Sequence, residues 1–310
     1  MPPPVRQGDL VGVAALSSRP APDRLEAGVA QLESLGLRVR VAANLDGGAV
    51  STDTPDYEGL LAGDDHFRVE SFHDLVRSEE VRAVFFARGG HGLLRVLPAI
   101  DWQLLARHPK AYVGYSDLTP LLVHLVQKLG LVTFHGPMIA TDLDRALEDS
   151  ERSTLMSSLE GRLPAFLECQ PVRGSDDCEG TLLGGCLSLL VATLGTEYSP
   201  DFRDCLLFLE DVGEPLYRID RMLTQLHLSG SLRDLKGMIL GHLETTDQQC
   251  DPAAIAALSL SPAGAPTFPV ACGLDCGHGR PNLTLPLGVR AVLRPAHGRL
   301  ELVTPGTLEA

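Results

Sequence analysis

The chain has 310 residues, enough for one large domain or two medium-sized domains that bury their own cores. It is 44% hydrophobic with a net charge of −14, which is typical of a soluble globular protein and argues against nucleic-acid or anionic-membrane partners. Because the first ten residues lack a signal-peptide core and no apolar run could span a bilayer, we expect a cytoplasmic protein.

Strand and helix signals alternate along the first half of the chain. Apolar strands are predicted at residues 9–16, 37–42, 81–87, 111–115 and 131–135. Helical stripes lie between them, at Leu25, Val29 and Leu32, at Val69, Phe72 and Val76, and along residues 121–129, which Thr119-Pro120 opens and Gly130 ends. This alternation predicts a parallel, doubly wound sheet with its ligand sites at the carboxyl ends of the strands.

The second half of the chain is less regular. Residues from about 160 to 180 are polar, acidic and interrupted by Gly and Pro, so they predict a passage between domains. We therefore expect an N-terminal α/β domain at 1–160, a linker at 161–180 and a C-terminal domain at 181–310. Elements expected after the linker are a helix around 183–194, a strand at 205–209, a helix carrying Ile219, Met222, Leu223 and Leu226, and strands near 237–243, 268–274 and 289–303.

All seven cysteines lie in the second half, at positions 169, 178, 186, 205, 250, 272 and 276. An odd number without a secretion signal predicts free thiols rather than a disulfide framework. Cys272 and Cys276 form a loose pair, but no second Cys/His pair completes a metal site, so we expect thiols without a metal.

Ser116 stands where an apolar strand turns into a helix, in Gly114-Tyr-Ser-Asp-Leu-Thr-Pro120. A serine at such a corner is lifted off the sheet and lies near the N–H groups of the next helix, which is the geometry of a nucleophile elbow. The motif lacks the usual Gly-x-Ser-x-Gly pattern, and Ser-Asp before a helix is more often an ordinary N-cap. Taken alone, these residues leave both interpretations open.

Three other segments place polar groups at ends of apolar elements. The loop 88–92, Arg-Gly-Gly-His-Gly, follows a strand and suits either a plain turn or an oxyanion hole; its spacing does not fit a dinucleotide site. Glu210 and Asp211 follow the strand 205–209 and could orient a histidine or cap a helix. His278 stands between two glycines, and His135 is its main rival as a catalytic base, although its place at a strand end suits orienting work at the rim of the site equally well.

The order Ser…Glu…His is that of a workable triad, although sequence order does not establish proximity. With these motifs in place, the chain resembles, nearly from end to end, the L,D-carboxypeptidase (muramoyltetrapeptide carboxypeptidase) family of serine peptidases, which includes microcin C self-immunity hydrolases. The segments that carry the resemblance are 8–15, 86–95, 113–119 (Val-Gly-Tyr-Ser-Asp-Leu-Thr), 133–138 (Thr-Phe-His-Gly-Pro-Met), 207–221 and 277–288.

The resemblance implies catalytic roles for Ser116 as nucleophile, Glu210 as acid and His278 as base. It excludes Glu214 as the acid, because the family's glutamate precedes Asp in a strand-end Leu-Glu-Asp. The oxyanion would be held by the backbone N–H groups of Asp117 and, in the glycine loop, Gly90. It further implies a metal-independent, cofactor-free homodimer whose N-terminal α/β domain is joined to a smaller, β-rich C-terminal domain, with the triad between them.

The sequence departs from the family pattern at three positions. His91 replaces a tyrosine in the glycine loop, Cys186 stands where asparagine is usual, and Leu16 replaces a proline before Ser-Ser. None is a member of the triad, but His91 and Cys186 could alter substrate contacts. Arg88 is a candidate for binding the substrate's free carboxylate.

The function implied is removal of the terminal D-alanine from murein tetrapeptides, at an L-Lys or meso-diaminopimelate centre, during peptidoglycan recycling. One alternative is a microcin-immunity type hydrolase acting on peptidyl-adenylates. Such proteins tend to be longer and carry an aromatic residue in the second domain that stacks on the nucleotide, whereas the sole tryptophan here, Trp102, lies in the first domain. Another alternative is a non-catalytic ligand-binding module on the same fold.

Overall fold

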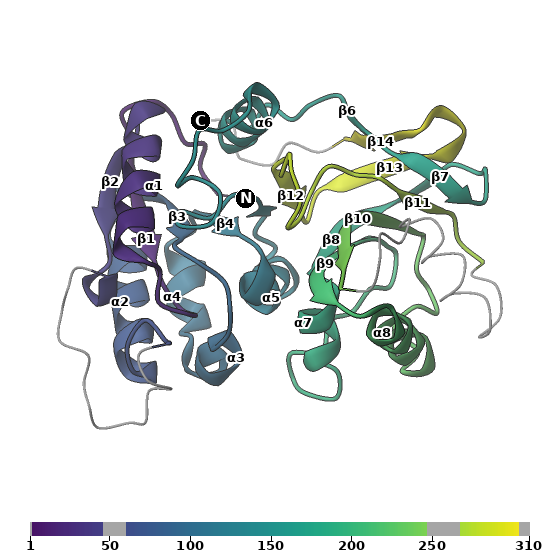
Figure 1. The fold of residues 1–310 in the computed structure, drawn as a ribbon, viewed down its shortest axis with the longest axis horizontal. Coiled ribbons are helices and arrows are strands. Elements are labelled where there is room, and N and C mark those ends of the chain that lie inside the picture. The colour runs from purple at the N-terminus through teal and green to yellow at the C-terminus, as the bar shows by residue number, and fades with distance from the viewer. Residues whose placement is uncertain (1, 46–59, 247–266, 304–310) are drawn as a thin grey trace.

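A computed structural model describes residues 2–45, 60–246 and 267–303, and Figure 1 shows two β-sheets lying side by side. The first half contains β1 (Leu10–Ala14), α1 (Pro22–Ser34), β2 (Arg38–Val41), η1 (Ala43–Leu45), α2 (Asp65–Arg77), β3 (Val81–Phe86), α3 (Leu93–Val96), η2 (Leu97–Ala99), α4 (Trp102–Arg107), β4 (Ala111–Gly114), η3 (Ser116–Leu118), α5 (Thr119–Leu129), β5 (Thr133–His135) and α6 (Asp149–Leu159). The second half contains β6 (Phe166–Glu168), β7 (Gln170–Arg173), β8 (Cys178–Cys186), α7 (Leu187–Ala192), β9 (Cys205–Glu214), α8 (Leu216–Leu228), β10 (Gly237–Thr245), β11 (Val270–Cys272), β12 (Leu285–Leu287), β13 (Arg290–Arg294), η4 (Pro295–His297) and β14 (Arg299–Leu302).

The first sheet confirms the predicted doubly wound arrangement. Its six strands run in the order β12-β5-β4-β3-β1-β2, and all neighbours except β12 and β5 are parallel. Parallel strands need crossover connections, which the helices supply, and both faces of such a sheet are covered. The carboxyl ends of β1, β3, β4 and β5 therefore lie along one edge, and the loops that follow them meet there.

The second sheet is mixed and has eight strands in the order β6-β14-β13-β8-β9-β10-β11-β7. Its centre, β8 to β11, is parallel, while β13, β14, β6 and β7 pair antiparallel around it. The stretch 161–180 supplies the two edge strands β6 and β7. A buried cluster that includes Leu207, Leu209, Ile219 and Leu223 packs α8 against this sheet, as the predicted helical stripe requires.

One strand from the second half joins the first sheet. β12 pairs antiparallel with β5, with Leu285 opposite His135, and it also contacts β8. Helix α5 likewise contacts both β5 and β8 and lies where the two halves meet (Figure 1). The two halves of the chain are thus joined by strand pairing within the first sheet as well as by contacts between the sheets.

Two predicted elements differ from the structure. The helix expected around 183–194 is a strand, β8, up to Cys186 and a helix only from Leu187 to Ala192. Residues 182–186 are buried, and a short apolar run of this kind fits a buried strand as well as a helix. The strand expected at 205–209 continues to Glu214, because β10 pairs with it along most of its length.

The cysteines within the described residues are free thiols, at positions 169, 178, 186, 205, 272 and 276. Cys250 lies outside the described residues. Nowhere in the described ranges is there a helix with the length and apolarity needed to cross a bilayer.

Candidate active site

The corner at Ser116 has the conformation of a strained strand-to-helix turn. β4 is buried throughout, Tyr115 is extended, and Ser116 has a φ of +59°, in the left-handed region. A residue with a side chain is destabilised there by about 1 kcal/mol, and such conformations persist mainly at functional sites. The turn places the half-buried Ser116 at the start of η3, just before α5.

The side chain of Asp117 joins three loops at this edge of the first sheet. Its Oδ2 atom accepts hydrogen bonds from Ser17 Oγ at 2.6 Å and from the Leu93 N–H at 2.9 Å. Ser17 follows β1, Leu93 follows the glycine loop, and Asp117 follows β4. Sequence reasoning considered only the backbone N–H of this residue; the Ser-Ser pair after the first strand was the available signal for its carboxylate.

The glycine loop packs directly on Ser116. A Cβ atom on Gly89 would lie 2.9 Å from Ser116 Oγ, and one on Gly90, which has a φ of +96°, would lie 2.3 Å from Ser18 Oγ. Glycine is therefore required at both positions. The exposed His91 donates its backbone N–H to Ser18 Oγ at 3.2 Å. The Nδ1 atom of its ring lies at the same distance, 3.2 Å, from Ser18 Oγ.

Arg68 stabilises this arrangement of loops through hydrogen bonds. Its fully buried guanidinium donates to the carbonyl of Leu16, to the carbonyl of Gly92 at 3.1 Å and to Asp65 at 2.5 Å. Sequence reasoning missed this residue, because an arginine on the face of a predicted helix normally lies in solvent.

We expect Arg68→Met to lower the free energy of unfolding by about 3 kcal/mol, because two buried carbonyls would lose a charged donor. Arg95→Met is the matched control, since the half-exposed Arg95 binds the same Asp65 but should contribute no more than about 1 kcal/mol. Urea denaturation of both variants measures the difference. Equal losses would show that Arg68 acts only through its ion pair.

His278 and Glu210 form a close pair in the second half. His278 Nδ1 lies 2.6 Å from Glu210 Oε2, which also accepts the His278 backbone N–H at 3.2 Å. Gly277 permits this approach, because a Cβ there would lie 2.7 Å from the same oxygen. Asn282 anchors the loop: its Oδ1 accepts the Gly277 N–H at 3.0 Å, and its N–H donates to Glu151 of α6 at 3.0 Å.

The electrostatics of the pair favour an ionised carboxylate and a basic imidazole. Burial by itself raises the pKa of Glu210, but contacts with His135 and His278 outweigh it and hold that pKa well below its usual range. Burial by itself lowers the pKa of His278. The hydrogen bond with Glu210 and the negative charges of Glu210, Asp211 and Asp142 outweigh burial and raise that pKa overall.

Ser116 and His278 line the same cavity of about 330 Å³, although they come from different halves of the chain. Its other described lining residues are Arg88, Gly89, Gly90, Met138, Thr141, Cys186, Ser188, Leu189, Asp211, Val212 and Glu214. The structure thus brings together the predicted residues Ser116, Gly90, Arg88 and His278, with Glu210 directly behind the imidazole. Chemically, this cavity combines a hydroxyl, an imidazole paired with a carboxylate, and a cation.

Four other residues considered from the sequence are placed differently. Glu214 lines the cavity but pairs with Arg218 at 3.0 Å, not with a histidine. His135 is fully buried and is not among the described lining residues, and neither is His91. Cys186 does line the cavity; burial raises the pKa of its thiol, with the charges of Glu210 and Asp211 adding to the effect.

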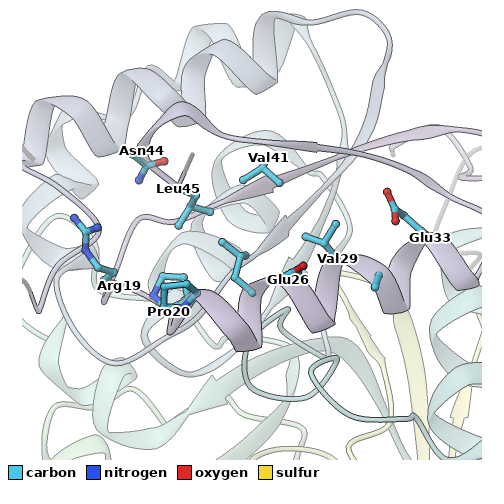
Figure 2. A pocket seen from close by; sticks show the side chains of 11 residues that line it. Arg19, Pro20, Glu26, Val29, Glu33, Val41, Asn44 and Leu45 are labelled. Carbon is cyan, nitrogen blue, oxygen red and sulfur yellow. The ribbon is translucent and has the colours of Figure 1, made fainter. Parts of the chain in front are cut away.

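A second cavity, of about 670 Å³, lies between α1 and β2 (Figure 2). Arg19, Glu26, Glu33 and Asn44 contribute its polar groups, and Leu25 and Val29 are among its apolar ones. None of its described lining residues has a hydroxyl, thiol or imidazole group. Although it is larger, it therefore lacks a serine or cysteine nucleophile with a histidine beside it, and the smaller cavity is the candidate active site.

Comparisons with known proteins show the family and the fold of the chain. Residues 11–136 match the family model described as LD-carboxypeptidase N-terminal domain, and residues 179–293 match the LD-carboxypeptidase C-terminal domain. The chain is 37% identical to the probable murein peptide carboxypeptidase of Bacillus subtilis over 94% of this chain and 91% of that protein. It is 29% identical, with a TM-score of 0.82, to the crystal structure of muramoyltetrapeptide carboxypeptidase from Oxalobacter formigenes, covering 97% of this chain and 100% of that one. A structure of microcin C7 self immunity protein MccF in complex with aspartyl sulfamoyl adenosine aligns with a TM-score of 0.87 at 25% identity, over 99% of both chains.

Proposed function

Because the chain belongs to the LD-carboxypeptidase family, we propose that it is a serine hydrolase that removes the terminal D-alanine from murein tetrapeptides. The bond cleaved joins the L-centre of lysine or meso-diaminopimelate to D-alanine. Ser116 is the nucleophile, His278 the base and Glu210 the acid of the triad. The observation that carries the proposal is the shared cavity. Ser116, whose backbone is in the left-handed region, and His278, whose imidazole is paired with Glu210, both line it.

The reaction follows from these placements. His278 Nε2 takes the proton from Ser116 Oγ as the oxygen attacks the amide carbonyl, and the N–H groups of Asp117 and Gly90 hold the oxyanion. The C–N bond then breaks, and His278 gives its proton to the amine of the departing D-alanine. Water, deprotonated by the same imidazole, attacks the acyl-enzyme and releases a tripeptide with a new carboxylate. Glu210 stabilises the imidazolium throughout.

The charged groups of the cavity suit a peptide substrate that ends in a free carboxylate. Arg88 is exposed and close to the glycine loop, so it can bind the free carboxylate of the leaving D-alanine. Because His91 belongs to the glycine loop and is exposed, we include it as a second substrate contact. The proposal extends to a homodimer acting in the cytoplasm, and to domain bounds of 1–160 and 181–310 joined through 161–180.

The pH dependence of the reaction should follow from the pair of His278 and Glu210. The base must be neutral to accept the proton, and its pKa is raised above the ordinary 6.5. We therefore expect kcat/KM to fall on the acid side with a midpoint above pH 6.5, about tenfold per pH unit below it. A profile of D-alanine release between pH 5 and 9 measures this midpoint. A midpoint below 6.5 would contradict a base paired with an ionised Glu210.

The test of the function is D-alanine release from tetrapeptides that carry L-Lys or meso-diaminopimelate, followed by mass spectrometry. Release by the wild-type protein would support the proposal and identify the preferred diamino acid. If neither tetrapeptide is cleaved, an aminoacyl sulfamoyl or peptidyl adenylate is the next substrate, because the fold also matches MccF closely. The absence of turnover with both classes would favour a binding module.

A further inference from the structure

The two oxygens of the Glu210 carboxylate have different neighbours. Oε2 accepts both hydrogen bonds from His278, whereas Oε1 lies 3.5 Å from Nε2 of His135. Within the described residues, Oε1 has no other polar partner at hydrogen-bond distance. Glu210 is fully buried, so an oxygen without a donor would leave a charged group incompletely solvated. His135 is thus the one described group that can serve this oxygen.

The fold holds His135 in place from several sides. It ends β5, where it is paired with Gly114 of β4 and Leu285 of β12. Its ring lies 5.3 Å from the ring of Tyr115 and 5.0 Å edge-on from that of Phe208. With no exposed surface, this imidazole cannot reach a substrate in the cavity, so a direct role as the base is excluded by its position.

We propose that His135 is a positioning residue: its Nε2–H faces Glu210 Oε1 and keeps Oε2 on the imidazole of His278. This inference rests on the proposed triad. A His135 ring that carries a proton on Nε2 supplies the donor, 3.5 Å from Glu210 Oε1. Because β5 is paired with a strand on each side, the imidazole that carries the donor is held in a fixed position.

Several titratable groups lie close to Glu210 and His278, and the effect of His135 has to be distinguished from their effects. Tyr115 packs on both imidazoles, at 4.8 Å from His278, and donates its hydroxyl to Asp142 at 3.3 Å. Asp211, Cys186 and Cys276 also lie near Glu210; Cys186 and Cys276 have raised thiol pKa values, first through burial. Within the described part of the chain, none of these groups forms a hydrogen bond with Glu210 Oε1, so a substitution of His135 changes the surroundings of that oxygen and leaves these groups in place.

His135→Phe and His135→Gln form the matched pair of variants. Phe keeps a ring between Tyr115 and Phe208 but removes the donor, and Gln removes the ring but retains an N–H at a similar reach. Without the donor, the unprotonated pair of Glu210 and His278 is destabilised more than the protonated pair, so the pair binds its proton at higher pH. We expect the midpoint of His278 to rise by roughly half a pH unit in His135→Phe and to stay near the wild-type value in His135→Gln.

Nuclear magnetic resonance titration of the histidine rings measures this midpoint without any substrate, and the His278 signal is assigned by its loss in His278→Gln. An unchanged midpoint in His135→Phe would overturn the proposal, as would an equal rise in both variants. Because the titration does not depend on turnover, failure of the tetrapeptide to be cleaved would reject the proposed function and leave this test intact.

If the tetrapeptide is cleaved, kinetics give a second readout. We expect His135→Phe to lower kcat about 10- to 100-fold with little change in KM, because the base is misaligned while the cavity that binds substrate is unchanged. His135→Gln should recover most of this loss. A rise in KM alone, or equal losses in kcat that follow a loss of thermal stability in both variants, would show a merely structural role for His135.

Discussion

Ser116→Ala should abolish D-alanine release, with kcat reduced on the order of 10⁶-fold. Without the hydroxyl, no acyl-enzyme can form, and the oxyanion donors and binding groups alone leave only a small residual rate. The fold should remain intact, because alanine removes a single atom from a half-buried position. Mass spectrometry of the tetrapeptide reaction measures the loss, and circular dichroism confirms the fold.

Ser188→Ala is the matched control for this change. Ser188 lines the same cavity, and its hydroxyl lies 3.3 Å from the Cys186 thiol. We expect its kcat to stay within about tenfold of the wild-type value, as is common for residues outside a catalytic unit. If Ser116→Ala retained turnover and Ser188→Ala lost it, the nucleophile would have been assigned to the wrong serine.

Glu210→Gln should lower kcat about 10⁴-fold, because an amide can hold the imidazole in the wrong tautomer and does not stabilise the imidazolium. The negative charge that raises the pKa of His278 would also be lost, so the acid midpoint of any residual activity should move to lower pH. The rate profile between pH 5 and 9 measures both effects.

Asp211→Asn separates the loss of a nearby charge from the loss of the imidazole contact. Asp211 is the next residue on β9, is also buried, and uses its carboxylate to accept the N–H groups of Ser188 and Val212. The Asp211→Asn substitution should lower kcat far less than Glu210→Gln does. Similar losses in the two variants would mean that the charge of the region, and not the contact with His278, supports the reaction.

The sequence predicted those features that local patterns determine. The alternation of apolar runs and helical stripes predicted the parallel first sheet, and Gly114 to Pro120 predicted a strand that turns into a helix at Ser116. The family resemblance then gave Glu210 and His278 as partners, and the structure places their side chains 2.6 Å apart. Neither composition nor spacing could have given that distance, because 68 residues separate the two in the chain.

Other features depend on contacts between distant segments, which local patterns do not encode. The apolar run at 183–194 fits a helix or a buried strand equally well, and only its pairing with β9 makes its first part a strand. The buried roles of Arg68 and Asp117 arise because loops after three strands meet at one edge. His135 was predicted as a rival for the catalytic base or as an orienting group at the rim of the site, whereas packing by Tyr115 and Phe208 buries it next to Glu210.

The pairing of β12 with β5 has a consequence for the order in which the enzyme is made. Residues 285–287 are synthesised about 150 residues after β5, so the edge of the first sheet beside His135 lacks its β12 partner until then. The loop that carries His278 precedes β12 by a few residues. A chain that terminates before this loop therefore has Ser116 and the parallel strands of the first sheet, but neither β12 nor the proposed base.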